Sequence, residues 1–256
     1  MAGYLHPNAA PFRLPGDCED AVLLLHGWTG SPAHLLPLGR RLNEAGYTAV
    51  GPLLAGHGTV IEDMVGKTWR DWIESALAPA LELIDEGKRL HLVGLSMGGV
   101  IALLLAPVVE AASVVTINAP QRVWDRRARF GEAFRGSDRI RPSDPAVPAP
   151  TEMLEYQQQY QGTPIGTIAE LKDLIRAANR NLHRVRCPAL IIQSHADETV
   201  KPVSGEIIFD RISSAEKGLV WLENARHVAL LDDERHTITT EVIDHLGRHS
   251  AAGSST

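Results

Sequence analysis

The sequence predicts an α/β protein built on a mostly parallel, doubly wound sheet. Short, continuously apolar segments, such as residues 21–25 and 189–193, alternate with longer segments of helical periodicity. Strands without polar alternation are typical of a parallel sheet that helices cover on both faces. A serine flanked by glycines, at residues 94–98, lies between one such strand and the helix that follows it. This arrangement is that of a strand-to-helix turn in an α/β sheet.

Composition narrows the class of protein. The chain has 256 residues, 44% hydrophobic and 22% charged, which is ordinary for one large or two small globular domains. Its net charge of −6 argues against a general nucleic-acid binder. Cys18 and Cys187 make no disulfide framework, so we expect buried free thiols.

Residues 1–20 lack a signal-peptide pattern, and the apolar stretch 100–109 is shorter than the roughly 20 residues that span a bilayer. We therefore expect a cytoplasmic protein without stable membrane insertion.

The first half of the chain contains most of the expected elements. Apolar runs predict strands, and helical periodicity predicts helices: strands at residues 21–25, 47–52, 89–93 and 113–118, helices at 35–45, 68–86 and 100–105. The helix at 68–86 has the clearest boundaries. Thr68, with Asp71 three residues later, resembles a capping box, and Gly87 follows the last turn. Pro79 is expected to kink this helix.

The alternation resumes after residue 180. We expect strands at 189–193 and 218–222, then a last helix at 233–249. The inner face of this helix is defined by apolar residues at helical spacing, namely Ile238, Val242, Ile243 and Leu246. Residues 251–256 are small and polar, which predicts a frayed tail.

Residues 122–180 interrupt the alternation and contain no apolar strand. A proline-rich stretch at 142–150 is followed by two helix-like stretches at 151–161 and 167–181. We expect this segment to form a small helical cap on a core made of residues 1–121 and 181–256. An insertion at the carboxyl edge of a parallel sheet lies over the usual ligand site, so the cap is expected to act as a lid.

Seven arginines begin this segment, and they have two interpretations. They could steer an anionic substrate toward the site. Alternatively, they form a solvated helical face whose charge is partly offset by Asp125, Glu132 and Asp138, which is the more common arrangement. The seven are Arg122, Arg126, Arg127, Arg129, Arg135, Arg139 and Arg141.

The pentapeptide Gly94-Leu95-Ser96-Met97-Gly98 has the pattern of a nucleophile elbow. In such a turn the serine adopts a strained backbone conformation, and its hydroxyl projects from the bend. A side chain at position 94 or 98 would collide with the crossing strand and helix. Ser96 is therefore the predicted nucleophile.

A serine hydroxyl needs a base to accept its proton and an acid to orient that base. In a doubly wound sheet these groups come from loops at the carboxyl ends of later strands. Asp197 follows the strand at 189–193, and His227 follows the strand at 218–222. We therefore predict His227 as the base and Asp197 as the acid that serve Ser96.

Other histidines and acids near these strands are weaker candidates. His195 shares the loop of Asp197, but a lone loop histidine is more often solvated than catalytic. Glu198 could replace Asp197 as the acid, and Asp197 is preferred from its position in the loop. His236 and His245 fall inside the expected last helix, where a base would lie too far from the sheet edge.

An acyl-transfer intermediate carries a negative oxygen that needs two backbone N–H donors. We expect one donor at Met97, the first residue after the serine. The second is expected at Trp28, within the sequence His26-Gly27-Trp28-Thr29-Gly30. The glycines there allow the backbone to approach a substrate closely, and the indole of Trp28 could form a wall of the acyl pocket.

Taken in order, these motifs resemble those of the α/β-hydrolase superfamily. The resemblance rests on residues 26–30, Gly56-His57-Gly58, residues 94–99, Asp197 and His227. More narrowly, the chain is similar to the small bacterial carboxylesterase and monoacylglycerol lipase group over about residues 20–121 and 186–246. The resemblance implies an α/β-hydrolase fold with a small helical cap. It also implies the following site: nucleophile Ser96, acid Asp197, base His227, and an oxyanion hole from the N–H groups of Trp28 and Met97.

The expected function is ester hydrolysis through an acyl-enzyme on Ser96, with a short- to medium-chain acyl ester such as a monoacylglycerol as the small-molecule substrate. The same triad also serves hydrolases of carbon–carbon, lactone or amide bonds. A non-catalytic, ligand-binding member of the fold is a third interpretation.

The sequence has no metal-ligand spacing, Walker-type loop or G-x-G-x-x-G motif, so we expect no metal or cofactor. Nothing in it predicts the oligomeric state.

Acyl-chain length is expected to depend on the cap. Its apolar residues could line a medium-chain pocket or hold the cap to the core, and the second role is preferred. These residues are Met153, Leu154, Tyr156, Ile165, Ile168 and Leu171.

Overall fold

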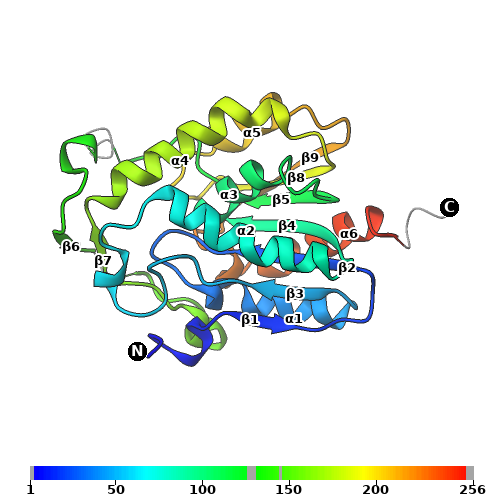
Figure 1. Ribbon diagram of the computed structural model, residues 1–256, viewed down its shortest axis with the longest axis horizontal. Helices are drawn as coiled ribbons and strands as arrows, with labels where there is room; N and C mark the ends of the chain where they lie inside the picture. The colour runs from blue at the N-terminus through cyan, green and yellow to red at the C-terminus, as the bar shows by residue number, and fades with distance from the viewer. Residues whose placement is uncertain (1–2, 126–130, 144–145, 252–256) are drawn as a thin grey trace.

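The chain forms one mostly parallel sheet, shown in the computed structural model of Figure 1, which describes residues 3–125, 131–143 and 146–251. Within these residues, seven strands are ordered β1-β3-β2-β4-β5-β8-β9. Strand β1 is antiparallel to β3, and the other neighbours are parallel. The strands are β1 (Phe12–Leu14), β2 (Asp20–Leu25), β3 (Thr48–Gly51), β4 (Arg89–Leu95), β5 (Ser113–Ile117), β8 (Ala189–Ser194) and β9 (Lys217–Leu222). The predicted α/β class and parallel sheet are confirmed.

Helices cover both faces of this sheet. They are α1 (Leu36–Glu44), α2 (Trp69–Asp85), α3 (Met97–Leu105), α4 (Thr167–Asn181), α5 (Val203–Arg211) and α6 (Arg235–Arg248). Alternate side chains of the central strand β2 enter different cores. Leu23 and Leu25 belong to the apolar cluster that contains residues of α2, α3, α4 and α5. Leu24 belongs to the cluster that contains residues of α1 and α6, so the strand is apolar throughout because both its faces are buried.

The predicted boundary signals of α2 are confirmed. The Asp71 carboxylate accepts the Thr68 N–H at 2.7 Å, and the Thr68 hydroxyl accepts the Asp71 N–H at 3.4 Å, which completes a capping box. Gly87 follows the helix with φ of +80°, a conformation that glycine adopts without strain.

Two elements of the core were not predicted. Strand β1 has only three residues at the sheet edge, too few to show a pattern. Helix α5 contains Gly205, and glycine weakens helix propensity. The glycine is needed because a Cβ at this position would lie 2.9 Å from Cβ of Gln193 on β8.

The segment between β5 and β8 differs from the prediction in two ways. The short strands β6 (Ile140–Pro142) and β7 (Gly162–Pro164) pair antiparallel, although no strand was expected there. The helix predicted at 151–161 is only a 3₁₀ helix at Thr151–Tyr156. Beyond it, core loops bind the backbone: Ser31 Oγ donates to the Gln158 carbonyl, and the Tyr160 N–H donates to the Thr29 carbonyl. These bonds replace those that would continue a helix.

The predicted helix at 167–181 is confirmed as α4. Its Leu174 and Ala178 belong to the same apolar cluster as residues of α2 and α3, so α4 is seated on the core. None of the helices in the described ranges is long and apolar enough to cross a membrane. Cys18 and Cys187 are free but only partly buried, and burial raises the pKa of the Cys187 thiol to about 11.

Candidate active site

The turn at Ser96 joins β4 to α3 in a strained conformation. Ser96 has φ of 55° and ψ of −120°, a region that non-glycine residues rarely occupy. A Cβ at Gly94 would lie 2.3 Å from the backbone of Gly98, and one at Gly98 would lie 1.9 Å from the carbonyl oxygen of Leu25. Both positions therefore require glycine, and the serine hydroxyl is presented at the carboxyl edge of the sheet.

Ser96, His227 and Asp197 form one hydrogen-bonded chain. His227 Nε2 lies 2.9 Å from Ser96 Oγ, and its Nδ1 lies 2.9 Å from Asp197 Oδ2. The Asp197 carboxylate is buried and also accepts the N–H groups of Thr199 and Val200, each at 2.8 Å. Because Nδ1–H donates to this carboxylate, Nε2 is left with a lone pair directed at the Ser96 hydroxyl.

The other candidates lie elsewhere or have different partners. Glu198 accepts the backbone N–H of His227 at 3.0 Å and does not contact the imidazole's Nδ1. His195 is exposed and stacks on Trp221, with ring centroids 4.3 Å apart. His236 and His245 lie in α6, and burial lowers the pKa of His245 to about 3.

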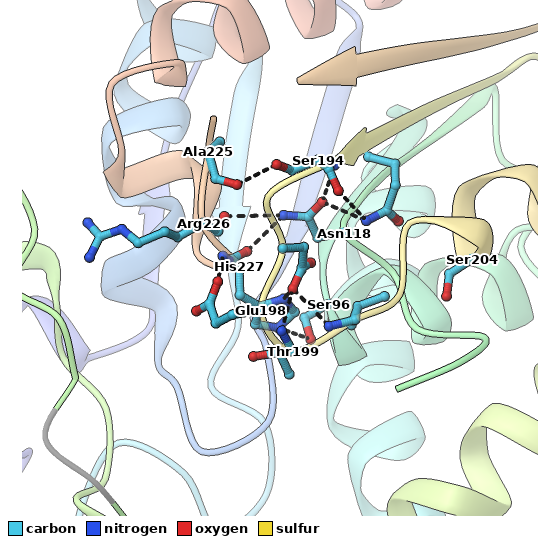
Figure 2. Close-up of polar contacts among 12 residues, drawn as sticks. Ser96, Asn118, Ser194, Glu198, Thr199, Ser204, Ala225, Arg226 and His227 are labelled. Atoms are coloured by element: carbon cyan, nitrogen blue, oxygen red, sulfur yellow. Dashed lines mark hydrogen bonds and ion pairs between the residues drawn. The ribbon is translucent and has the colours of Figure 1, made fainter. Parts of the chain in front are cut away.

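Asn118, which the sequence did not suggest, supports the loop of His227 (Figure 2). Asn118 follows β5 with φ of +48°, and its Nδ2 donates to the His227 carbonyl at 3.0 Å. Its Oδ1 accepts the N–H of Ser194 at 2.9 Å and Nε2 of Gln193 at 3.1 Å. Ser194 Oγ in turn donates to the Ala225 carbonyl. An asparagine directly after a buried strand, at the edge where ligands bind, was the available signal.

The expected oxyanion donors are the residue after Ser96 and a residue of the loop that lies against it. Met97 is the first residue of α3, where an amide has no acceptor within the helix. Gly27 lies against the serine, since a Cβ there would be 3.4 Å from Ser96 Cβ, and Trp28 follows it. His26 fixes this loop: Nδ1 donates to the Gly27 carbonyl at 2.9 Å, and Nε2 accepts the Leu54 N–H at 3.1 Å.

A cavity of about 780 Å³ opens over Ser96 and His227. Trp28 lines it, as do Ile165, Ile168 and Leu171 from the segment that precedes and forms α4. The remaining apolar residues of the predicted set are elsewhere. Met153 and Tyr156 pack with Leu36 and Leu231 in a separate cluster, and Leu154 is exposed.

His34 is a second residue that the sequence did not suggest. It lines the same cavity and is buried. Burial lowers its pKa to about 4, with a further contribution from the nearby His227. His34 therefore faces the cavity as a neutral imidazole at neutral pH. Among the described residues, no group of three or more His, Cys, Asp or Glu side chains could hold a metal ion.

The strand order, the strained turn at Ser96 and the hydrogen bonds that link Ser96, His227 and Asp197 are together typical of α/β hydrolases. The chain belongs to the α/β hydrolase family, which it matches over residues 22–238. It is a hydrolase with named relatives along nearly its whole length.

Two curated relatives are similar in sequence. A carboxylesterase of Bacillus subtilis (strain 168) is 31% identical over 92% of this chain and 95% of that protein. A thermostable monoacylglycerol lipase of Bacillus sp. (strain H-257) is 36% identical over 90% of this chain and 91% of that protein.

Solved structures show the same fold. One, from work on the metagenome-derived lipolytic enzymes LipS and LipT, superposes with a TM-score of 0.87 at 34% identity, covering 95% of this chain and 99% of the other. Monoglyceride lipase from Saccharomyces cerevisiae superposes with a TM-score of 0.79 at 15% identity, covering 98% of this chain and 96% of the other. The second likeness concerns the fold alone.

Proposed function

We propose that this protein is a serine carboxylic-ester hydrolase that acts on short- to medium-chain acyl esters, such as monoacylglycerols, through an acyl-enzyme on Ser96. The observation that carries the proposal is the chain from Ser96 through His227 to the buried Asp197 beneath a partly apolar cavity. The carboxylesterase and the monoacylglycerol lipase that the chain resembles support ester hydrolysis in particular.

The first half of the reaction acylates the serine. His227 Nε2 takes the proton of Ser96 Oγ while the oxygen attacks the ester carbonyl. Asp197 stabilises the imidazolium that results and keeps it oriented. The backbone N–H groups of Met97 and Trp28 are proposed to bind the oxyanion. His227 then gives the proton to the departing alcohol, and the acyl group stays on Ser96.

The second half releases the acid. Water enters where the alcohol left, and His227 removes its proton as it attacks the acyl carbonyl. Collapse of the second tetrahedral intermediate returns the proton to Ser96 and frees the carboxylic acid. Each step uses only groups of this chain and water.

The cavity wall suggests how the acyl group is held. Ile165, Ile168 and Leu171 provide an apolar surface suited to an alkyl chain, and Trp28 lies beside the nucleophile. We propose residues 122–180 as a cap, whose described part supplies most of this surface, on a core of residues 1–121 and 181–256.

Steady-state kinetics test the proposal. We expect turnover of p-nitrophenyl butyrate and of a short monoacylglycerol, with far slower cleavage of matched anilides and lactones. Ser96→Ala should lower kcat by about 10³-fold or more, because it removes the nucleophile. Ser213→Ala, which changes an exposed serine that lines neither large cavity, should keep full activity. Near-full activity of Ser96→Ala would refute the assignment, and cleavage of the anilide or lactone alone would favour the alternative bond.

A further inference from the structure

The arginines that begin the segment after β5 have different surroundings. Arg135 is neutralised, since it forms ion pairs with Glu132, Glu170 and Asp173. It fits the interpretation of a solvated, charge-balanced face. Arg126, Arg127 and Arg129 lie outside the described residues. The remaining arginines, Arg122, Arg139 and Arg141, have no acidic side chain within ion-pair distance in the part of the chain that the structure describes.

Arg139 and Arg141 line the cavity over Ser96. Arg141 lies in β6, and Arg139 is the residue directly before that strand. Because alternate residues of an extended segment point to the same side, both side chains leave the backbone toward the cavity that they line. Their backbone is held in place: Arg141 is paired with Thr163 of β7, and the Arg139 carbonyl accepts the Ile165 N–H at 3.0 Å. Two exposed arginine side chains therefore extend from a backbone that pairs with β7 beside the cavity.

The acidic residues of the cavity are Asp125 and Glu198, and Glu198 is engaged by the backbone N–H of His227. An adjacent cleft of about 900 Å³ shares Val123 and Asp125 with the cavity. Five cationic residues line this cleft, and one of them, Arg176, is paired with Asp173 at 3.0 Å: Arg122, Lys172, Arg176, Arg180 and Arg211. Arginine and lysine residues outnumber the acidic residues in this lining, although the chain as a whole carries a net charge of −6. Such a field draws anions toward the site.

We propose that the active site prefers esters that carry an anionic group, a carboxylate or a phosphate, which Arg139 and Arg141 bind. The proposal rests on the proposed ester hydrolase function and specifies its substrate class. Ile140 and Ile165 beside the arginines contact the alkyl part, while a guanidinium pairs with a carboxylate or phosphate through two parallel hydrogen bonds. An amphiphilic, anionic ester is therefore cleaved faster than a neutral ester of the same length, which remains a substrate.

Matched substrates test this preference. The first pair is p-nitrophenyl hexanoate and the p-nitrophenyl hemiester of adipic acid, which places the charge on the acyl side. The second pair is p-nitrophenyl butyrate and 3-carboxy-4-nitrophenyl butyrate, which places it on the alcohol side. Competition by hexanoate and by hexyl phosphate against the neutral ester distinguishes a carboxylate site from a phosphate site.

The readout is the ratio of kcat/KM for the charged and the neutral ester of each pair. In the double variant Arg139→Gln/Arg141→Gln, this ratio should fall by about 10- to 100-fold in at least one pair, while kcat/KM for the neutral esters changes by less than about threefold. The double variant Arg139→Lys/Arg141→Lys should retain part of the preference, because it keeps the positive charges but loses the paired hydrogen bonds of the guanidinium groups. Arg186→Gln, an exposed arginine that lines neither cavity, should change nothing.

Different results would overturn the ester hydrolase function and the preference for anionic esters. An unchanged ratio in both pairs, with normal turnover of the neutral esters, would overturn the anionic preference alone. Absence of turnover of every ester by the unaltered protein would overturn the ester hydrolase function, and the preference with it. A preference that weakens as salt rises from 50 to 500 mM supports ion pairing at the arginines.

Discussion

The side-chain amide of Asn118 donates to the main-chain carbonyl of His227 at 3.0 Å, while its oxygen accepts the N–H of Ser194 at 2.9 Å. One side chain thus ties the end of β5 to the end of β8 and to the loop after β9 (Figure 2). His227 is held through its carbonyl by Asn118, through its N–H by Glu198 and through Nδ1 by Asp197. The imidazole is therefore oriented before substrate binds.

Asn118→Ala should lower kcat by about 10- to 100-fold with KM little changed, because it loosens the base without touching the substrate cavity. The free energy of unfolding should also fall by about 1–3 kcal/mol, since buried partners lose their hydrogen bonds. Steady-state kinetics and urea denaturation measure the two effects. A rise in KM at constant kcat would show that Asn118 acts on substrate binding instead.

Asp197 and Glu198 are predicted to have unequal roles. In Asp197→Asn the amide Nδ2 would face Nδ1 of His227, so the imidazole would carry its proton on Nε2 and could not accept one from Ser96. We expect kcat to drop by about 10³- to 10⁴-fold. Glu198→Gln keeps an oxygen to accept the His227 N–H, so kcat should stay within about threefold. Equal losses in the two variants would contradict this division between orienting acid and loop support.

Gly98→Ala should be severely destabilising. Its Cβ would be placed 1.9 Å from the Leu25 carbonyl oxygen, so β2 and α3 would have to move apart. We expect a loss of about 3 kcal/mol or more in the free energy of unfolding. Gly247→Ala is the matched control: Gly247 is exposed in α6 with nothing within 4 Å, and the substitution should stabilise by about 0.5–1 kcal/mol. Similar stability of both variants would show that the turn does not require glycine.

Acid should destabilise the fold through buried histidines. Burial lowers the pKa of His57 to about 4 and holds that of His26 well below its usual range. In the unfolded chain these imidazoles take up protons near pH 6.5, whereas in the folded protein they stay neutral down to about pH 4. Their contribution to the free energy of unfolding is therefore complete above pH 6.5 and is lost as pH falls toward 4. In His57→Gln the pH dependence of the free energy of unfolding between pH 6 and 4.5 should be shallower by about 1.4 kcal/mol per pH unit. Identical slopes would mean that His57 is not buried in its neutral form.

The elements that the sequence predicts well are those whose signals are local. The capping box of Thr68 and Asp71 and the glycines around Ser96 involve residues a few positions apart, so their chemistry can be read directly. The positions of Asp197 and His227 after their strands follow from sheet topology, because parallel strands end at the same edge. The structure brings these residues within hydrogen-bond distance of each other.

The remaining features depend on distant contacts. The helix predicted at 151–161 stops at Tyr156 because the backbone beyond it bonds to loops that carry Ser31 and Thr29. No local pattern encodes those partners. Asn118 was missed for the same reason, since the partners of its side chain come from β8 and from the loop after β9.

A fluorophosphonate probe followed by peptide mass spectrometry tests the central claim most directly. We expect one covalent adduct per chain, on Ser96, with ester hydrolysis lost in proportion to labelling and no adduct in Ser96→Ala. Stoichiometric labelling of a different residue, or continued ester hydrolysis by fully labelled protein, would contradict the assignment of Ser96 as the nucleophile.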